Sequence, residues 1–362
     1  MKPSRTTKRI ITMVIVDSLC LAVALLVFAF FHHVYSSYFG SAQPQALPQA
    51  AVSATAEPEP EVTPEPVVET ATETVTADTA ETTDAQPAAT AEPTPEPTAV
   101  PTGLLGGKYQ DKFSYTGTVK DDTSYRSANV AVELTTTEAY DSIIHVLDIY
   151  IQNLSSFRTY VPRNEGSKSK ELMPIEADTE LGGVIAVTSG DQFYSHSVKG
   201  YIVRNGNLYY STKDPSSDVC ILYSDGTMAT FSGSAFDPDT EVAKGVQQVW
   251  SFGPALLDNG TALTSFKSSV SGKNPRLAIG YFEPGHYCLV EVDASRNSDN
   301  SSSKGVTLAE LAQFFESLGC QVAYNLDGGG TAGMVFNSTK ICKPGRRATD
   351  LIYICEPTEA AN

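Results

Sequence analysis

The sequence predicts an α+β fold, with mostly antiparallel or mixed β-sheet and few helices, preceded by a transmembrane helix and a disordered stalk. Three observations support this prediction. A basic N-terminus is followed by a long apolar run, and the next segment is rich in Ala, Pro, Thr and Glu. The remainder consists mainly of short β-rich runs separated by Asn-Gly and Asp-Gly turns. At 362 residues, the chain is long enough for one large domain in addition to these segments.

The N-terminal segment has the pattern of a signal anchor. Several basic side chains lie within residues 1–9, and an apolar run begins at Ile10. Because a membrane-spanning helix needs about 20 apolar residues, we predict a basic cytoplasmic tail at 1–9 and a transmembrane anchor at 10–33. The basic flank predicts a single-pass cell-membrane protein with a cytoplasmic N-terminus and an extracellular domain. A cleaved signal peptide is the alternative, because residues 40–42 are small.

The next segment has the composition of a disordered chain. It contains repeats such as EPEPEVTPEPVVET, and no Lys or Arg occurs from residue 41 to residue 101. Such a segment buries too little apolar surface to become ordered, and its prolines stiffen it. We therefore predict an acidic Pro/Thr/Glu-rich stalk at 34–102, a domain at 103–357 and a C-terminal tail at 358–362. The net charge of −17 argues against nucleic acid as a partner.

Strand signals dominate the region after the stalk. Buried or alternating β-rich runs occur at residues 143–151, 182–194, 200–210, 219–231 and 249–257. Asn-Gly or Asp-Gly pairs, which favour tight hairpin turns, occur at residues 205–206, 225–226 and 259–260. Helices are expected near residues 135–140, near residues 238–246 and from Thr307 onward.

Cysteine and histidine positions leave the disulfide and metal content open. Of six cysteines, Cys20 lies in the apolar run, and the odd number outside it means that at least one is free or pairs between chains. Cys342 and Cys355 flank a turn and are expected to face each other across a hairpin, unless both are simply small buried side chains. The ligand spacings of common zinc sites do not occur. The metal is therefore unknown and no cofactor is required, although a divalent cation is compatible with the sequence. Among the histidines, His196 is of interest because it follows a predicted turn.

One stretch near the end of the chain combines a helix, a strand and a glycine-rich turn. Thr307 and Glu310 have the spacing of a capping box, and Gly319 provides a residue that commonly ends a helix. A short strand at 321–326 then leads into Asp327 and three glycines. Glycines accept positive φ angles, so a ligand can approach the backbone and its N–H groups closely. The alternative is a flexible hairpin turn with a solvated carboxylate.

The motifs of this stretch resemble the phosphodiester glycosidase family. They are NLDGGG at residues 325–330, the preceding GVTLAELAQFFESLG, and NPRLAIGYFEPGHYCLVEVD at residues 274–293. A weaker resemblance extends from about residue 143 to residue 354. The resemblance implies an enzyme, a hydrolase that removes the sugar from a sugar 1-phosphodiester. It also implies that Arg276, in the R-x-A-I-G motif, and the less specific Arg346 match arginines of the family.

The implied reaction suggests a role for each candidate residue. A carboxylate must stabilise positive charge at the anomeric carbon, the leaving oxygen must be neutralised, and the phosphate requires cationic or N–H donors. The expected catalytic residues are Asp327, Asp191 and Asp293. The expected substrate-binding residues are Arg276, Asn325, Gly328, Gly329, Gly330, Thr331 and Arg346. The structural alternatives are that Asp191 and Asp293 are turn residues and that Arg276 is a salt-bridge partner.

Four positions depart from the family motifs. Ser189 stands where the family has Asn, Ala294 and Ser295 replace Gly and Arg or Gln, and Gly333 replaces Thr. The predicted function is a membrane-anchored, cell-surface glycosidase that hydrolyses a sugar 1-phosphodiester in a surface polymer or glycoconjugate. Its predicted partners are a phosphosugar or cell-surface glycan and, through residues 10–33, the membrane. The departures favour the alternative, a catalytically degenerate carbohydrate- or phosphosugar-binding surface protein of the same fold.

Overall fold

The computed structural model describes residues 103–162, 170–191, 200–294, 303–342 and 344–357, together with the short strand β1 at Gln45–Ala46. Apart from β1, the predicted cytoplasmic tail, membrane anchor and stalk lie outside the described residues, as do His196, Ser295 and the C-terminal tail. No helix in the described part of the chain is long and apolar enough to cross a membrane.

Antiparallel sheets build the described domain, which confirms the predicted mostly antiparallel α+β class. The seven-stranded sheet has the order β17-β15-β16-β5-β4-β3-β2. Its strands are β2 Val119–Lys120, β3 Ser124–Arg126, β4 Val130–Ala139, β5 Ser142–Ile151, β15 Arg276–Glu283, β16 His286–Val292 and β17 Val322–Leu326. All its neighbouring strands run antiparallel.

Two further sheets complete the domain. The five-stranded sheet has the order β19-β18-β7-β20-β6, with β6 Phe157–Tyr160, β7 Ala186–Ser189, β18 Met334–Phe336, β19 Thr339–Lys340 and β20 Leu351–Ile354. The six-stranded sheet has the order β1-β9-β8-β12-β10-β11, with β8 Gly200–Arg204, β9 Asn207–Thr212, β10 Val219–Tyr223, β11 Met228–Phe231 and β12 Val246–Trp250. β1, which falls within the predicted stalk, pairs with β9. β13 Leu257–Asp258 and β14 Thr261–Ala262 form a separate small hairpin.

Few helices accompany the sheets. The α-helices are α3 Pro174–Glu180, α4 Pro238–Val242 and α5 Leu308–Leu318. The 3-10 turns are η2 Gln110–Lys112, η3 Leu154–Ser156 and η4 Gly329–Thr331. The predicted capping box of α5 is confirmed, because Thr307 accepts from the Glu310 N–H and the Glu310 side chain accepts from the Thr307 N–H. Gly319 ends the helix with a φ of 87°.

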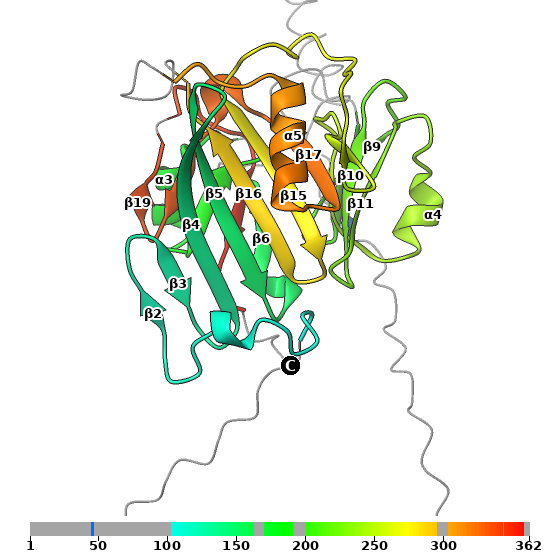
Figure 1. Cartoon of the computed structure of the whole chain (residues 1–362). Coiled ribbons are helices and arrows are strands. Elements are labelled where there is room, and N and C mark those ends of the chain that lie inside the picture. The colour runs from blue at the N-terminus through cyan, green and yellow to red at the C-terminus, as the bar shows by residue number, and fades with distance from the viewer. Residues whose placement is uncertain are drawn as a thin grey trace, which may run out of the picture. The chain divides into compact units, whose positions relative to one another are not determined.

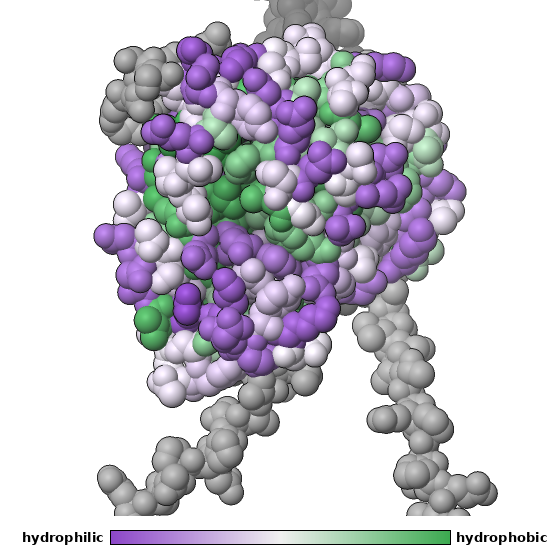
Figure 2. Space-filling view, viewed as in Figure 1, coloured by the Kyte–Doolittle hydropathy of each residue, from purple (hydrophilic) through white to green (hydrophobic). Residues whose placement is uncertain are grey.

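The seven-stranded sheet carries a core on each face. Alternate residues of β5, such as Leu147 and Ile149, enter the core shared with the five-stranded sheet. Their neighbours Ile144 and Val146 pack in the core that includes α5, which lies across this sheet in Figure 1. Figure 2 shows apolar side chains that remain at the surface beside α5 on this face. Burial on both faces makes this sheet the centre of the domain.

One predicted helix is wrong. Residues 135–140 belong mainly to β4, where Thr135, Thr136 and Thr137 pair with Val146, His145 and Ile144 of β5. Three successive β-branched threonines favour the strand, because their side chains fit a pleated surface better than a helical turn. The other two helices are confirmed, although α4 ends earlier than expected, at Val242.

The predicted hairpin turns are confirmed, and of the two alternatives left open for Cys342 and Cys355 the structure rules out a hairpin that brings them face to face. Asn205 and Gly206 have φ angles of 51° and 74°, as the tight turn between β8 and β9 requires. β18 and β7 lie between β19 and β20, so Cys342 and Cys355 do not flank a hairpin, and both are free. Two other buried thiols, Cys288 and Cys320, approach to 3.7 Å between their Sγ atoms.

Candidate active site

The predicted site forms where the ends of two strands from different sheets meet. The Asp327 N–H, after β17, donates to the Gly190 carbonyl, after β7, at 3.0 Å. Asp191 follows Gly190 directly, so this bond brings two of the predicted catalytic aspartates to one junction. The Gly190 N–H donates at 3.0 Å to the carbonyl of Asp350, which precedes β20. Three carboxylates therefore come from three separate parts of the chain.

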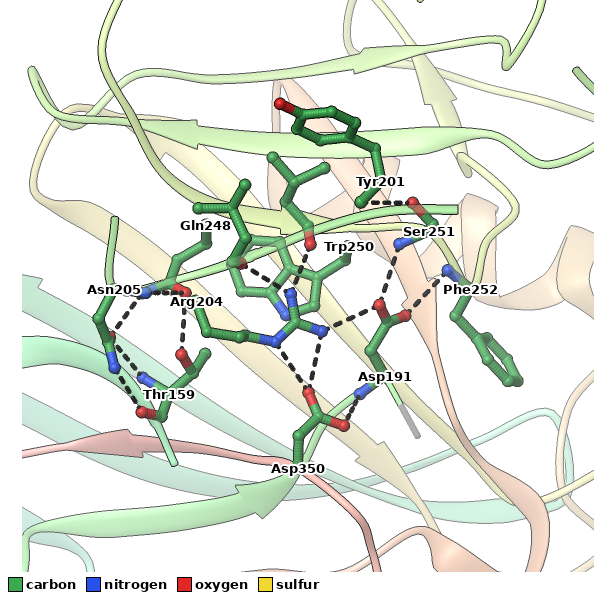
Figure 3. A network of polar contacts seen from close by, with 12 residues as sticks. Thr159, Asp191, Tyr201, Arg204, Asn205, Gln248, Trp250, Ser251, Phe252 and Asp350 are labelled. Carbon is green, nitrogen blue, oxygen red and sulfur yellow. Dashed lines mark hydrogen bonds and ion pairs between the residues drawn. The ribbon is translucent and has the colours of Figure 1, made fainter. Parts of the chain in front are cut away.

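Arg204 lies between two of these carboxylates (Figure 3). Its Nη2 atom is 3.0 Å from both Asp191 Oδ2 and Asp350 Oδ2, and all three side chains are at most 1% exposed. Its Nη1 atom donates to backbone carbonyls of β8 and β12. The backbone N–H of Asp191 donates to Asp350 Oδ1 at 2.9 Å. This arrangement satisfies a buried arginine and two buried carboxylates within the chain.

A second set of bonds fixes the strand that carries Arg204. Gln248 of β12 accepts from the Thr159 hydroxyl at 2.9 Å and from the Asn205 N–H at 3.0 Å (Figure 3). Asn205 in turn donates from its side chain to the Thr159 carbonyl at 2.7 Å. Thr159 belongs to β6, so these bonds connect the six-stranded sheet to the five-stranded sheet. They hold the Arg204 backbone at a defined distance from Asp350.

The carboxylate of Asp327 faces a different arginine. Arg346 Nη2 lies 3.2 Å from Asp327 Oδ2, and Arg346 Nε donates to the hydroxyl of buried Thr331 at 2.8 Å. Asp327 is only 6% exposed, whereas the Arg346 side chain is 48% exposed. The guanidinium therefore reaches from the surface to a carboxylate that is largely shielded from water.

Two of the three predicted catalytic aspartates, Asp327 and Asp191, have a raised pKa. Burial raises the pKa of Asp327 to about 6, against the opposing effects of Thr331 and Arg346. Burial likewise raises the pKa of Asp191 to about 6, with Arg204 lowering it and Asp350 raising it further. Carboxylates that titrate near neutral pH are common in active sites, where their charge state must match the chemistry.

The glycines after Asp327 are required by close packing. A Cβ atom on Gly328 would lie 2.7 Å from the Pro275 carbonyl oxygen, and Gly329 has a φ of 59°. The Gly329 N–H donates to the Pro275 carbonyl at 2.8 Å. One of the N–H groups that were expected to be available to an anionic ligand is therefore already bonded within the chain. The turn thus brings the end of β17 close to the start of β15.

Three other candidates direct their side chains to contacts outside this junction. Arg276 is buried, and its guanidinium donates to the carbonyls of Val306, Val270 and Gly272, which favours a structural role. Asn325 donates to the Gly253 carbonyl at 2.8 Å, so its amide holds a neighbouring turn. Asp293 lies at the end of β16, where its Oδ2 atom is 3.8 Å from His145 Nε2.

Sequence reasoning missed two members of the site, Arg204 and Asp350. Each lies next to a recognisable feature, since Arg204 precedes the Asn-Gly turn and Asp350 precedes a β-rich run. Neither position has a local motif, and the two residues meet only because Arg204, on β8 of the six-stranded sheet, reaches Asp350 at the start of β20 in the five-stranded sheet. Ser189, one of the motif departures, is fully buried, and its hydroxyl has no hydrogen-bond partner among the described residues.

Comparisons with known proteins find similarity to phosphodiester glycosidases. Residues 182–355 match the model of the phosphodiester glycosidase family. N-acetylglucosamine-1-phosphodiester alpha-N-acetylglucosaminidase of Bos taurus is 32% identical over 206 residues, which are 52% of this chain and 38% of that protein. The Mus musculus enzyme is 23% identical over 219 residues, 56% of this chain and 41% of that protein. An SPbeta prophage-derived protein of Bacillus subtilis is 26% identical over 230 residues, 61% of this chain and 34% of that protein.

A solved structure is similar as well. The catalytic domain of the zebrafish N-acetylglucosamine-1-phosphodiester alpha-N-acetylglucosaminidase, auto-inhibited by its pro-peptide, has 18% identity and a TM-score of 0.49. The match covers 63% of this chain and 83% of that chain. The curated relatives are longer, and the matches span between 34% and 41% of their length.

Proposed function

From the match of residues 182–355 to the phosphodiester glycosidase family, we propose that the chain is a hydrolase that cleaves a sugar 1-phosphodiester. The observation that carries the proposal is the pair formed by a buried carboxylate, Asp327, and a half-exposed guanidinium, Arg346, at 3.2 Å. Asp191, Arg204, Thr331 and Asp350 all lie in the matched region. N-acetylglucosamine is the first sugar to test, because it is the sugar named for the curated relatives.

Asp327 is the reacting carboxylate in this proposal. Cleavage of the bond between the anomeric carbon and the phosphate oxygen develops positive charge on the sugar. A pKa of about 6 leaves Asp327 mainly ionised at neutral pH, where its charge stabilises that transition state. Water supplies the hydroxyl group of the released sugar, and the other product is a phosphomonoester.

Arg346 is the phosphate-binding group. A planar guanidinium binds two phosphate oxygens at once, and Arg346 presents an exposed portion to solvent while Thr331 fixes its Nε. It also neutralises the negative charge that collects on the departing phosphate. A phosphomonoester leaves readily, so the reaction does not require a strong general acid at the leaving oxygen.

Asp191 acts as a positioning residue. Its Oδ2 atom accepts from Arg204 and from the Ser251 N–H, and its Oδ1 atom accepts from the Phe252 N–H. A carboxylate with both oxygens occupied by chain donors is poorly placed to attack a sugar. The carbonyl of the adjacent Gly190 accepts a hydrogen bond from the Asp327 N–H. Through this contact Asp191 holds the reacting carboxylate in place.

The cellular setting is part of the same proposal. A signal anchor at residues 10–33 and a stalk at 34–102 hold the domain outside the cell membrane, where a surface polymer or glycoconjugate carries the substrate. The basic flank and the Pro-rich acidic composition support this arrangement.

The test measures the products of a simple N-acetylglucosamine 1-phosphodiester incubated with the full-length protein in ¹⁸O-labelled water. We expect sugar and phosphomonoester in equal amounts, with no ¹⁸O in the phosphomonoester, because the bond to the anomeric carbon breaks. Asp327→Asn lowers the rate by at least about 100-fold. Incorporation of ¹⁸O into the phosphomonoester, or an Asp327→Asn protein as active as the wild type, would contradict the proposal.

A binding protein without catalysis is the second candidate. The orphaned hydroxyl of buried Ser189, where the family has Asn, is the observation that favours it. In that case the wild-type protein binds the phosphodiester in calorimetry but releases no sugar. Restoration of activity by Ser189→Asn would identify this position as the cause.

A further inference from the structure

A second group of titratable side chains lies at the end of the seven-stranded sheet and is not used in the proposed reaction. His145 on β5 is the cross-strand partner of Glu291 on β16, and Asp293 directly follows the end of β16, two residues beyond Glu291. All three side chains are buried. One ligand atom from each lies within 4.8 Å of the ligand atoms of the other two. Three potential metal ligands therefore converge at one point.

The carboxylates of this group lack partners. Glu291 is 0% exposed, and within the described residues neither of its carboxylate oxygens has a hydrogen-bond partner of ordinary geometry. The same holds for Asp293 Oδ1. A buried carboxylate without a donor or a counter-charge is strongly destabilising. Two such groups beside an imidazole point to a cation as the missing partner.

We propose that His145, Glu291 and Asp293 bind a divalent transition-metal ion, with Zn²⁺ the best fit. A Zn²⁺ ion at about 2.1 Å from each ligand holds neighbouring ligand atoms about 3–4 Å apart. The separation of 3.8 Å between His145 Nε2 and Asp293 Oδ2 meets this requirement. No ion pair with Lys or Arg competes for these carboxylates among the described residues.

The histidine is already oriented for such a role. His145 Nδ1 lies 2.9 Å from the Thr136 hydroxyl on β4, which leaves Nε2 directed toward the carboxylates. A hydrogen bond at the second ring nitrogen is the usual way in which a metal-binding histidine is held in position. β4 pairs with β5 at these two residues, so the sheet register produces the contact.

The ligand set selects the kind of metal. An imidazole nitrogen favours Zn²⁺ over Ca²⁺ and Mg²⁺, which prefer oxygen ligands. The ligand group consists of one imidazole and two carboxylates. Three protein ligands are the usual number at an open Zn²⁺ site, where a fourth ligand from solution completes the coordination.

This site is separate from the proposed catalytic pair. Leu277 pairs with Glu291 on one side and with Leu326 on the other, so the metal site and Asp327 lie at the same end of the sheet on different strands. His145 lies outside the region that matches the family model. The proposal therefore does not depend on hydrolase activity, and its test does not measure activity.

The test titrates Zn²⁺ into chelator-treated full-length protein by calorimetry. We expect one ion per chain and an affinity loss of at least about 100-fold for Glu291→Gln and for Asp293→Asn. Thr136→Val lowers the affinity by about 10-fold, because it removes the group that orients His145. Glu241→Gln is the matched control, since Glu241 is also buried but bonds to Tyr223 and Lys244. It binds Zn²⁺ as the wild type does.

The visible spectrum of bound Co²⁺ identifies the ligands. We expect the d–d bands of a four-coordinate site without a thiolate charge-transfer band, because the ligand group in the described residues contains no cysteine. Circular dichroism of each variant verifies folding, and Asp293→Asn provides the test if Glu291→Gln does not fold. Absence of stoichiometric Zn²⁺ binding, preference for Ca²⁺, or unchanged binding in the folded variants would overturn the proposal.

Discussion

Two pairs of buried carboxylates lie in this domain, and they differ in how their charge is balanced. Asp191 and Asp350 share the guanidinium of Arg204, with three side chains almost fully buried and each carboxylate within 3.0 Å of Nη2. Glu291 and Asp293 are also buried, yet no Lys or Arg among the described residues forms an ion pair with them. The first pair is completed by the chain itself, whereas the second requires a proton or an ion from solution.

The difference indicates separate uses for similar residues. A cluster completed by arginine needs no cation from the solution to balance its carboxylates. A cluster without an internal cation responds to what the solution supplies. The following predictions test this contrast, beginning with the largest expected effect.

Removal of Arg204 should cause the largest loss of stability. Arg204→Met keeps much of the side-chain volume but leaves two buried carboxylates without their cation, which typically costs about 3–5 kcal/mol. Urea unfolding at neutral pH measures the effect. A variant about as stable as the wild type would show that Asp191 and Asp350 do not depend on Arg204.

The pH dependence of stability should reveal the raised pKa of Asp327. The Asp327 carboxyl group stays protonated up to about pH 6 in the folded protein but only up to about pH 4 in the unfolded chain. The stabilising contribution is complete below about pH 4 and is lost as the pH rises through about 6. The unfolding free energy of wild type relative to Asp327→Asn should therefore fall by up to about 3 kcal/mol between these limits. A difference that does not vary with pH would contradict the raised pKa.

Substitution of Gly190 should test how tightly the arginine-completed cluster is packed. A Cβ atom there would lie 2.7 Å from Asp350 Oδ2 and 3.1 Å from the Asp350 carbonyl oxygen. Gly190→Ala should therefore cost about 1–3 kcal/mol. Gly272→Ala is the control, because nothing lies within 4 Å of its Cβ position. Equal melting temperatures of the two variants would mean that the cluster accommodates the added methyl group without loss of stability.

The smallest expected effect has the opposite sign. In chelator-treated protein, Glu291→Gln should raise the unfolding free energy by about 1 kcal/mol, since it replaces an unpartnered buried carboxyl group with a neutral amide. With excess Zn²⁺ the wild type should become the more stable protein. Addition of Zn²⁺ should therefore reverse the order of the two melting temperatures. This reversal distinguishes the cluster of Glu291 and Asp293 from the cluster that Arg204 completes.

Local chemistry made much of the fold predictable from the sequence. Thr307, Glu310 and Gly319 define a helix by capping, and Asn205 with Gly206 defines a turn through positive φ angles. Such features depend on neighbouring residues alone. The threonines of β4 were misread although their β-branched side chains favour a strand, and they pair with β5, the next strand along the chain.

The candidate site was predictable only in part. Asp327 and Asp191 were recognised because each stands in a short motif at the end of a strand. Arg204 and Asp350 were missed because nothing in their local sequence marks them, and their contact arises from the meeting of two sheets. The His145 cluster escaped for the same reason, since its ligands come from strands far apart in sequence and show no regular spacing.

The position of β20 in the five-stranded sheet has a consequence for folding during synthesis. This last described strand lies between β7 and β6, with Ile354 paired to Phe157 and to Ala186. On the ribosome, β6 and β7 therefore emerge long before the strand that joins them, and Arg204 emerges before Asp350. The edges of β6 and β7 that β20 joins stay unpaired until β20 has emerged, which slows the formation of this sheet and leaves these edges open to incorrect pairing.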